Sequence, residues 1–233
     1  MTFHSLASSS KGNAYLVSDG ETTLLLECGL TFKALKYRAG FRLAQIGACF
    51  VTHEHLDHSR AAAQLLRHGM PVYMSEGTAA AHKDPMDEAH LIRAGDEVRV
   101  GHLLVTAFAA YHNAAEPLGF LIFDERTREK LLFAIDTVNL NYIVPGLDYI
   151  AIECNYARDI MDRLDRMDEA RKRRVQRSHM EIDTAVRYLH KLDLGRCRVI
   201  WLMHLSAACS NEHRFLTTFR REFPGIDIRV CPE

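Results

Sequence analysis

The segment Thr52–His58 (Thr-His-Glu-His-Leu-Asp-His) places three imidazoles and the Asp57 carboxylate within six residues. Zinc and similar borderline ions bind imidazole nitrogen and carboxylate oxygen readily. The alternation indicates that His53 and His55 bind one ion, and that Asp57 and His58, one turn onward, bind a second. The alternative is a polar loop that is rich in histidine by chance. The apolar run 46–51 directly precedes the segment and is typical of a buried strand that could position these ligands.

Four more polar residues stand where apolar strands are expected to end. Each follows an apolar run, and side chains at the ends of neighbouring strands can converge on one rim of a sheet. Taken singly, such residues more often form ordinary hydrogen bonds at a strand end than bind a metal ion. Taken together with the 52–58 cluster, they predict a site with more ligands than one metal ion needs. These residues are His112, Asp136, Glu153 and His204.

The rest of the chain supplies the elements that must hold these groups. Asp19-Gly20 predicts a hairpin turn, because both residue types tolerate positive φ. Thr31 predicts the N-cap of a helix that ends near Gly40. Strands dominate the middle of the sequence and helices recur on both sides, which predicts two face-to-face sheets with helices outside, in one α/β domain of residues 1–233. We expect strands at 13–17, 21–28, 46–51, 71–74, 98–100, 103–109, 118–123, 130–133, 148–152, 198–203 and 226–230, and helices at 59–68, 78–82, 157–176, 182–192 and 211–222.

Composition limits the function classes. The 233 residues carry a net charge of −1, so no global field attracts nucleic acid and any polyanion site must be local. No stretch approaches about 20 uncharged apolar residues, so the sequence predicts no membrane-spanning helix. The first residues lack the pattern of a signal peptide, and the six cysteines are widely scattered. We therefore expect a cytoplasmic protein with reduced thiols and no membrane partner.

The order of the candidate ligands resembles that of the metallo-β-lactamase-fold hydrolases. Their His-x-His-x-Asp-His motif and their later His, Asp and final His match His53–His58, His112, Asp136 and His204. Two further segments resemble motifs of a bacterial exonuclease group encoded beside the Wal two-component operon. These segments are residues 6–13 (Leu-Ala-Ser-Ser-Ser-Lys-Gly-Asn) and 112–120 (His-Asn-Ala-Ala-Glu-Pro-Leu-Gly-Phe), within a resemblance that extends from Ser5 to about Ser210. Glu27 and Asn113 stand where that group usually has Asp, and neither is expected to ligate metal directly.

The resemblance implies a fold, a metal complement and a ligand assignment. The fold is a four-layer αββα sandwich, and the cofactors are two divalent ions, with Zn²⁺ expected and Mn²⁺ as the alternative. Neutral imidazoles and two carboxylates bring about −2 against the +4 of two such ions, so about +2 remains to hold a phosphodiester anion. Asp57 could also orient the attacking nucleophile. The first ion is assigned to His53, His55 and His112, the second to Asp57, His58 and His204, and Asp136 is assigned as the bridge.

A proton donor for the leaving group is also implied. Residues 178–185 (Ser-His-Met-Glu-Ile-Asp-Thr-Ala) resemble the His-containing motif of ribonuclease Z, and 153–156 (Glu-Cys-Asn-Tyr) resemble its matching Glu element. In those enzymes the Glu orients the His, which protonates the leaving oxygen. A carboxylate beside an imidazole raises the imidazole pKa toward the working range of a general acid. We therefore predict that Glu153 and His179 form such a pair; the alternative is a solvated strand end and a residue at a helix entry.

Two weaker signals concern nucleic acid. Arg171–Arg174 leads into His179 and could place phosphate-binding charge beside the site, although mixed charges upstream are typical of a solvated helix. Residues 8–13 could contact phosphate or form an ordinary turn.

The leading hypothesis is a metal-dependent phosphodiesterase that hydrolyses nucleic acid, DNA rather than RNA, as an exonuclease. The alternatives are a ribonuclease Z-like RNA-processing endonuclease, a small-molecule phosphodiesterase and a non-catalytic metal-binding regulatory protein. No long Gly/Pro-rich insertion resembles the tRNA-clamping arm of ribonuclease Z. Oligomeric state stays open.

Overall fold

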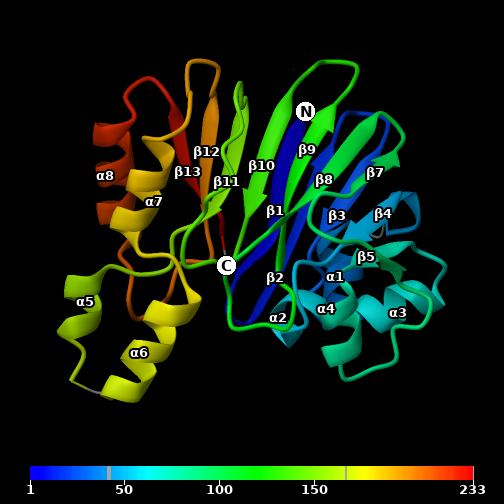
Figure 1. The fold of residues 1–233 in the computed structure, drawn as a ribbon, viewed down its shortest axis with the longest axis horizontal. Helices are drawn as coiled ribbons and strands as arrows, with labels where there is room; N and C mark the ends of the chain where they lie inside the picture. Colours follow the sequence, from blue (N-terminus) through cyan, green and yellow to red (C-terminus); the bar gives the residue numbers. More distant parts are fainter. Residues whose placement is uncertain (41–42, 166, 233) are drawn as a thin grey trace. The chain divides into compact units, whose positions relative to one another are not determined.

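The computed structural model describes residues 1–40, 43–165 and 167–232, which form two compact units (Figure 1). The N-terminal unit consists mainly of Met1–Ala109 and Ala114–Glu129, and the C-terminal unit consists of Ala110–Asn113 and Lys130–Cys231. No helix in the described part of the chain is long and apolar enough to cross a membrane.

The N-terminal unit contains a six-stranded sheet in which the strand order follows the chain order. The first three strands are antiparallel and the next three are parallel, so β3, β4, β5 and β6 run in the same direction. The predicted hairpin turn at Asp19-Gly20 joins β2 to β3, with Gly20 at φ 99°. The strands are β1 (Thr2–Ser9), β2 (Gly12–Ser18), β3 (Thr23–Leu26), β4 (Ala48–Phe50), β5 (Val72–Met74) and β6 (His90–Leu91).

A second group of strands in this unit is an antiparallel meander of β7 (Glu97–Val100), β8 (Leu103–Ala109) and β9 (Leu118–Asp124). Gly119 on β9 pairs with Phe108 on β8, and a Cβ at Gly119 would lie 2.3 Å from the Phe108 ring. The glycine of the 112–120 motif is therefore required by close packing on the neighbouring strand.

Short helices connect these strands. The predicted N-cap is confirmed, because the Thr31 hydroxyl accepts a hydrogen bond from the Ala34 backbone N–H. The single helix predicted at 59–68 is wrong: two helices form, since the Ala61 N–H donates to the Cys28 carbonyl (2.9 Å) and so leaves the helical ladder. The helices are α1 (Phe32–Arg38), α2 (Leu56–Ser59), α3 (Ala62–Arg67) and α4 (Glu76–Ala81), with a 3₁₀ turn at Leu43–Gln45.

The C-terminal unit contains four parallel strands in the order β13-β12-β11-β10. The central residues of β10, β11 and β12 are buried apolar side chains, as expected for parallel strands covered on both faces. Parallel strands bring their carboxyl ends to one edge, where Glu153 is the last residue of β11 and His204 directly follows β12. The strands are β10 (Lys130–Ala134), β11 (Tyr149–Glu153), β12 (Val199–Met203) and β13 (Asp227–Val230).

Four helices complete this unit: α5 (Arg158–Asp162), α6 (Glu169–Ser178), α7 (Ile182–Leu189) and α8 (Glu212–Glu222). Figure 1 shows α7 and α8 beside β12 and β13, and α5 and α6 together below them. The single helix predicted at 157–176 is wrong. It is divided because Met161 and Met167 both pack around Tyr156 and Cys209, and because the Asp168 carboxylate caps a new helix by accepting from the Arg171 N–H (2.7 Å).

Candidate metal centre and proton donor

Three polar residues at strand ends have left-handed backbone conformations. Glu27 (φ 63°) and His204 (φ 54°) directly follow β3 and β12, and Asp136 (φ 45°) lies two residues beyond β10. This conformation costs a residue with a side chain about 1–3 kcal/mol, and it persists where the surrounding structure imposes it. All three side chains are almost completely buried. Strained, buried polar residues of this kind are typical of functional sites.

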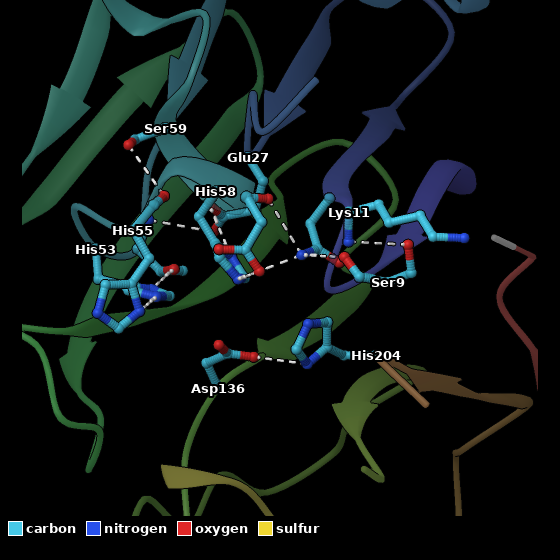
Figure 2. Close-up of polar contacts among 12 residues, drawn as sticks. Ser9, Lys11, Glu27, His53, His55, His58, Ser59, Asp136 and His204 are labelled. Atoms are coloured by element: carbon cyan, nitrogen blue, oxygen red, sulfur yellow. Dashed lines mark hydrogen bonds and ion pairs between the residues drawn. The ribbon is translucent and has the colours of Figure 1, made fainter. Parts of the chain in front are cut away.

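In the N-terminal unit, His53 and His55 have their ring nitrogens close together. His53 Nε2 lies 3.1 Å from His55 Nδ1, as Figure 2 shows. The other nitrogen of His53, Nδ1, lies 2.9 Å from the Thr52 hydroxyl, and this contact orients the ring. Adjacent ligand nitrogens of a zinc ion with bonds of about 2.0–2.1 Å lie roughly 2.9–3.4 Å apart. The two imidazoles therefore have a separation that a divalent ion can accept.

His58 is oriented by a buried carboxylate. Its Nδ1 lies 3.3 Å from Glu27 Oε2, and its Nε2 lies 3.5 Å from Asp57 Oδ2. The second oxygen of Glu27 accepts a hydrogen bond from the Thr52 N–H (3.1 Å). Burial raises the pKa of Glu27, although the contacts with His58 and Thr52 oppose this effect. Glu27 thus lies beside Nδ1, and Nε2 lies on the side of Asp57. A carboxylate on the far side of the ring is common behind metal-binding histidines.

The residue that orients His58 was missed in the sequence, where Glu27 is noted only as a departure from the usual Asp. A usable signal was present, because Glu27 is an acidic residue next to the end of an apolar strand. The same signal identified Asp136 and Glu153.

The region where β1 turns into β2 contacts the segment that carries Asp57 and His58. The Asn13 side-chain amide donates to the carbonyls of Ser9 (3.1 Å) and Asp57 (3.2 Å), and its nitrogen lies 3.2 Å from His58 Nε2. Gly29 also lies against the Asp57 backbone, since a Cβ at Gly29 would lie 1.7 Å from the Asp57 carbonyl oxygen. Residues 8–13 thus include a buried contact to the segment that carries the candidate ligands Asp57 and His58, which sequence patterns alone did not predict.

In the C-terminal unit, Asp136, Glu153, His179 and His204 each offer one ligand-type atom, and these atoms all lie within 4.8 Å of one another. Asp136 Oδ1 lies 2.9 Å from His204 Nδ1, a contact drawn in Figure 2. Asn155 fixes the His204 backbone, because its amide donates to the His204 carbonyl (2.8 Å). The strand-end residues of this unit therefore converge as their positions in the sequence predicted.

His112 joins this cluster through Asp136, with 3.5 Å between Nε2 and Oδ2. Its Nδ1 donates to the Ser178 carbonyl at 2.6 Å, which leaves Nε2 as the ring atom that could bind a metal ion. Burial lowers the pKa of His112 and outweighs the attraction of the nearby carboxylates. This shift favours the neutral imidazole, which is the form that binds metal ions.

Glu153 and His179 form a short contact, with 2.7 Å between Oε1 and Nδ1. The other oxygen of Glu153 accepts hydrogen bonds from the backbone N–H groups of Thr137 (2.8 Å) and Met180 (3.2 Å). Burial opposes the positive charge of His179, but the carboxylates of Glu153 and Asp136 outweigh it and raise the pKa of the imidazole. Burial likewise opposes the charge of Glu153, yet His179 and the hydrogen bonds lower the pKa of this carboxyl.

The predicted residues thus form one cluster in each unit. The N-terminal unit brings together His53, His55, Asp57 and His58, and the C-terminal unit brings together His112, Asp136, Glu153, His179 and His204. Imidazoles and carboxylates with ring orientations set by Thr52, Glu27 and Ser178 fit the donor set of a divalent metal ion. These clusters are able to hold divalent metal.

Comparison with protein families decides the classification. A model of the β-lactamase superfamily domain matches residues 22–205, a span that extends into both units. The chain belongs to this superfamily. It is 30% identical to exodeoxyribonuclease YycJ of Bacillus anthracis over 219 residues, which is 88% of this chain and 82% of that protein. Exodeoxyribonuclease WalJ of Streptococcus pneumoniae is 26% identical over 67% of this chain and 63% of its own length. The resemblance to this exonuclease group is confirmed.

Solved structures show the fold. The metallo-β-lactamase fold protein YhfI from Bacillus subtilis is similar with a TM-score of 0.74 at 14% identity, covering 99% of this chain and 96% of that one. A diphosphatase from the PhnP family has a TM-score of 0.69 at 16% identity, covering 97% of this chain and 92% of that one. Human tRNase Z, short form, has a TM-score of 0.66 at 13% identity, covering 100% of this chain and 97% of that one. The predicted metallo-β-lactamase fold class is confirmed. The named enzymes are hydrolases, and the prediction of a metal-dependent hydrolase is confirmed with them.

Proposed function

We propose that the protein is a dinuclear metal-dependent phosphodiesterase that hydrolyses nucleic acid and acts as a DNA exonuclease. The observation that carries this proposal is the Glu153–His179 pair within a cluster of candidate metal ligands. Such a pair provides a proton donor next to the place where a metal-held phosphate would react. The 30% identity to an exodeoxyribonuclease supports DNA as the polymer.

The proposed centre holds two divalent ions. When bound, divalent ions neutralise phosphate charge and lower the pKa of coordinated water toward about 7. Zn²⁺ is the expected metal because imidazole nitrogens dominate the donor set, and Mn²⁺ is the alternative. The ligand assignment follows the order of the family motif: His53, His55 and His112 for one ion, Asp57, His58 and His204 for the other, and Asp136 for both.

The catalytic roles are assigned to three residues of the chain. His179 gives a proton from Nε2 to the leaving sugar oxygen, because its Nδ1 is engaged by Glu153. Glu153 keeps the ring in place and favours its protonated form, with its own position set by two backbone N–H groups. Asp57, whose side chain is 24% exposed, orients the attacking water as well as binding metal.

A cytoplasmic location belongs to the same proposal. It is supported by the cysteines, because all six are buried free thiols, as is usual in a reducing compartment.

End-labelled single- and double-stranded DNA and RNA of matched sequence test the proposed function. We expect the metal-loaded protein to shorten DNA from an end, and we expect a chelator to stop the reaction, because every assigned ligand serves the metal ions. Internal cuts in RNA would instead support a ribonuclease Z-like endonuclease. Hydrolysis of small diesters alone would support a small-molecule phosphodiesterase. Bound metal without any hydrolysis would support a non-catalytic metal-binding regulatory protein.

A further inference from the structure

Helix α6 has a strong positive charge in a protein that is nearly neutral overall. Its ten residues, Glu169–Ser178, include five basic side chains and one acidic side chain. The sequence drew attention to Arg171–Arg174, but the structure changes the set of residues. Lys172 is half-buried and pairs with Glu169 (3.4 Å), whereas Arg177, outside that run, is exposed. The exposed charge therefore extends toward the C-terminal end of the helix.

Three of these arginines lie on one face. At 100° per residue, Arg173, Arg174 and Arg177 fall within about 100° of the helix circumference, and all three are exposed. In the described part of the chain, none of the three guanidinium groups is paired with a carboxylate. We call Arg173, Arg174 and Arg177 the α6 stripe.

The α6 stripe is held at a fixed place relative to two imidazoles of the site. Ser178, the last residue of α6, accepts the hydrogen bond from His112 Nδ1 through its carbonyl. The next residue is His179, the proposed proton donor. On the opposite face, Val175 packs against the small core around Tyr156 and Met161. The helix is thus anchored on both sides, and Arg177 lies only two residues before the proton donor.

We propose that the α6 stripe binds backbone phosphates of the nucleic-acid strand whose scissile phosphate reaches His179. The inference rests on the proposed function and adds the surface that places the polymer. Guanidinium groups bind phosphate through paired N–H donors, and their spacing of about 6 Å along the axis between Arg173 and Arg177 allows separate phosphates to be bound.

A purely structural role does not account for the α6 stripe. Basic residues stabilise a helix when they lie in its last turn, where they offset the negative end of the dipole. Arg177 meets this condition. Arg173 and Arg174 lie in the middle of α6, where the dipole effect is small, and the described residues provide no carboxylate partner for them. A bound polyanion accounts for all three.

The test replaces Arg173, Arg174 and Arg177 together with Gln, which keeps the side chain long and favours helix. A matched control replaces Lys33, Arg67 and Arg220 with Gln, since these exposed residues give the same loss of charge elsewhere. Both sets are made in a His179→Ala background to slow cleavage during the binding measurement. Fluorescence anisotropy then measures binding of labelled single-stranded DNA at several salt concentrations. We expect the stripe variant to bind more weakly, with a log–log salt slope reduced by up to about 2, and the control to match the parent.

Hydrolysis of bis(p-nitrophenyl) phosphate is measured in the same variants with His179 intact. This diester lacks the neighbouring phosphates that the α6 stripe is proposed to bind, so its hydrolysis should not change. An unaltered salt slope, or an equal loss of DNA binding in the control, would contradict phosphate binding by the α6 stripe even if the parent degrades DNA. A parent that binds DNA through the stripe but never cleaves it would overturn the proposed function alone.

Discussion

Replacing His179 with alanine is expected to slow DNA cleavage by roughly 10²–10⁴-fold while sparing most hydrolysis of bis(p-nitrophenyl) phosphate. The reason lies in the leaving groups. A sugar alkoxide is a poor leaving group and needs a proton, whereas p-nitrophenolate is already a stable anion. The two substrates therefore separate loss of a proton donor from loss of metal or general damage. Rates on both substrates and the metal content of the purified variant are the measurements.

Glu153→Gln provides the matched variant for this prediction. Two backbone N–H groups point at Glu153 Oε2, so the Gln carbonyl oxygen is expected to take that place. The Gln amino group then faces His179 Nδ1, where it donates a hydrogen bond instead of accepting one. The imidazolium loses its stabilising charge, and DNA cleavage should fall less than in His179→Ala with the same sparing of the aryl diester. Equal losses on both substrates, with metal content intact, would mean that His179 is not the proton donor.

Replacing Asp136 is expected to remove metal and activity together. One carboxylate is assigned to both ions, where it also offsets their mutual repulsion. Loss of groups that merely support a ligand costs about 10–100-fold in affinity or activity, so loss of this ligand should exceed about 100-fold on both substrates. Asp136→Asn is the appropriate change, because Asn tolerates the left-handed backbone found here (φ 45°). Elemental analysis and rates on both substrates test it.

His213→Ala is the control for this prediction, since His213 is exposed on α8 and belongs to neither cluster. Its metal content and rates should match the unmodified protein. If Asp136→Asn and His213→Ala behave alike, the ligand assignment is wrong.

The candidate site was predictable wherever an apolar run ends in a polar residue. His204 and Glu153 were found in this way, since a buried parallel strand is visible in the sequence as a run of apolar residues. The proximity of His53 to His55 was predicted from their alternation in the sequence. The distant partners were not predictable, because neither the hydrogen bond from His112 to Ser178 nor the contact of Asn13 with Asp57 leaves a local pattern.

The errors in the fold have the same origin. The interruption after α5 depends on Met161 and Met167 turning toward Tyr156 and Cys209, which lie elsewhere in the chain. The break between α2 and α3 depends on a single hydrogen bond from Ala61 to Cys28. Helical periodicity continues through both breaks, so only tertiary contacts reveal them. By contrast, the cap at Thr31 is a local interaction, and it was predicted from the sequence.

The central claim is that the two clusters bind two divalent ions and use them to hydrolyse phosphodiesters. Stepwise addition of Zn²⁺ or Mn²⁺ to chelator-stripped protein tests this claim most directly, with bound metal and bis(p-nitrophenyl) phosphate hydrolysis measured on the same samples. We expect two ions per chain and activity that rises as they bind. Metal content that stays near zero, or two bound ions without any hydrolysis, would contradict this claim.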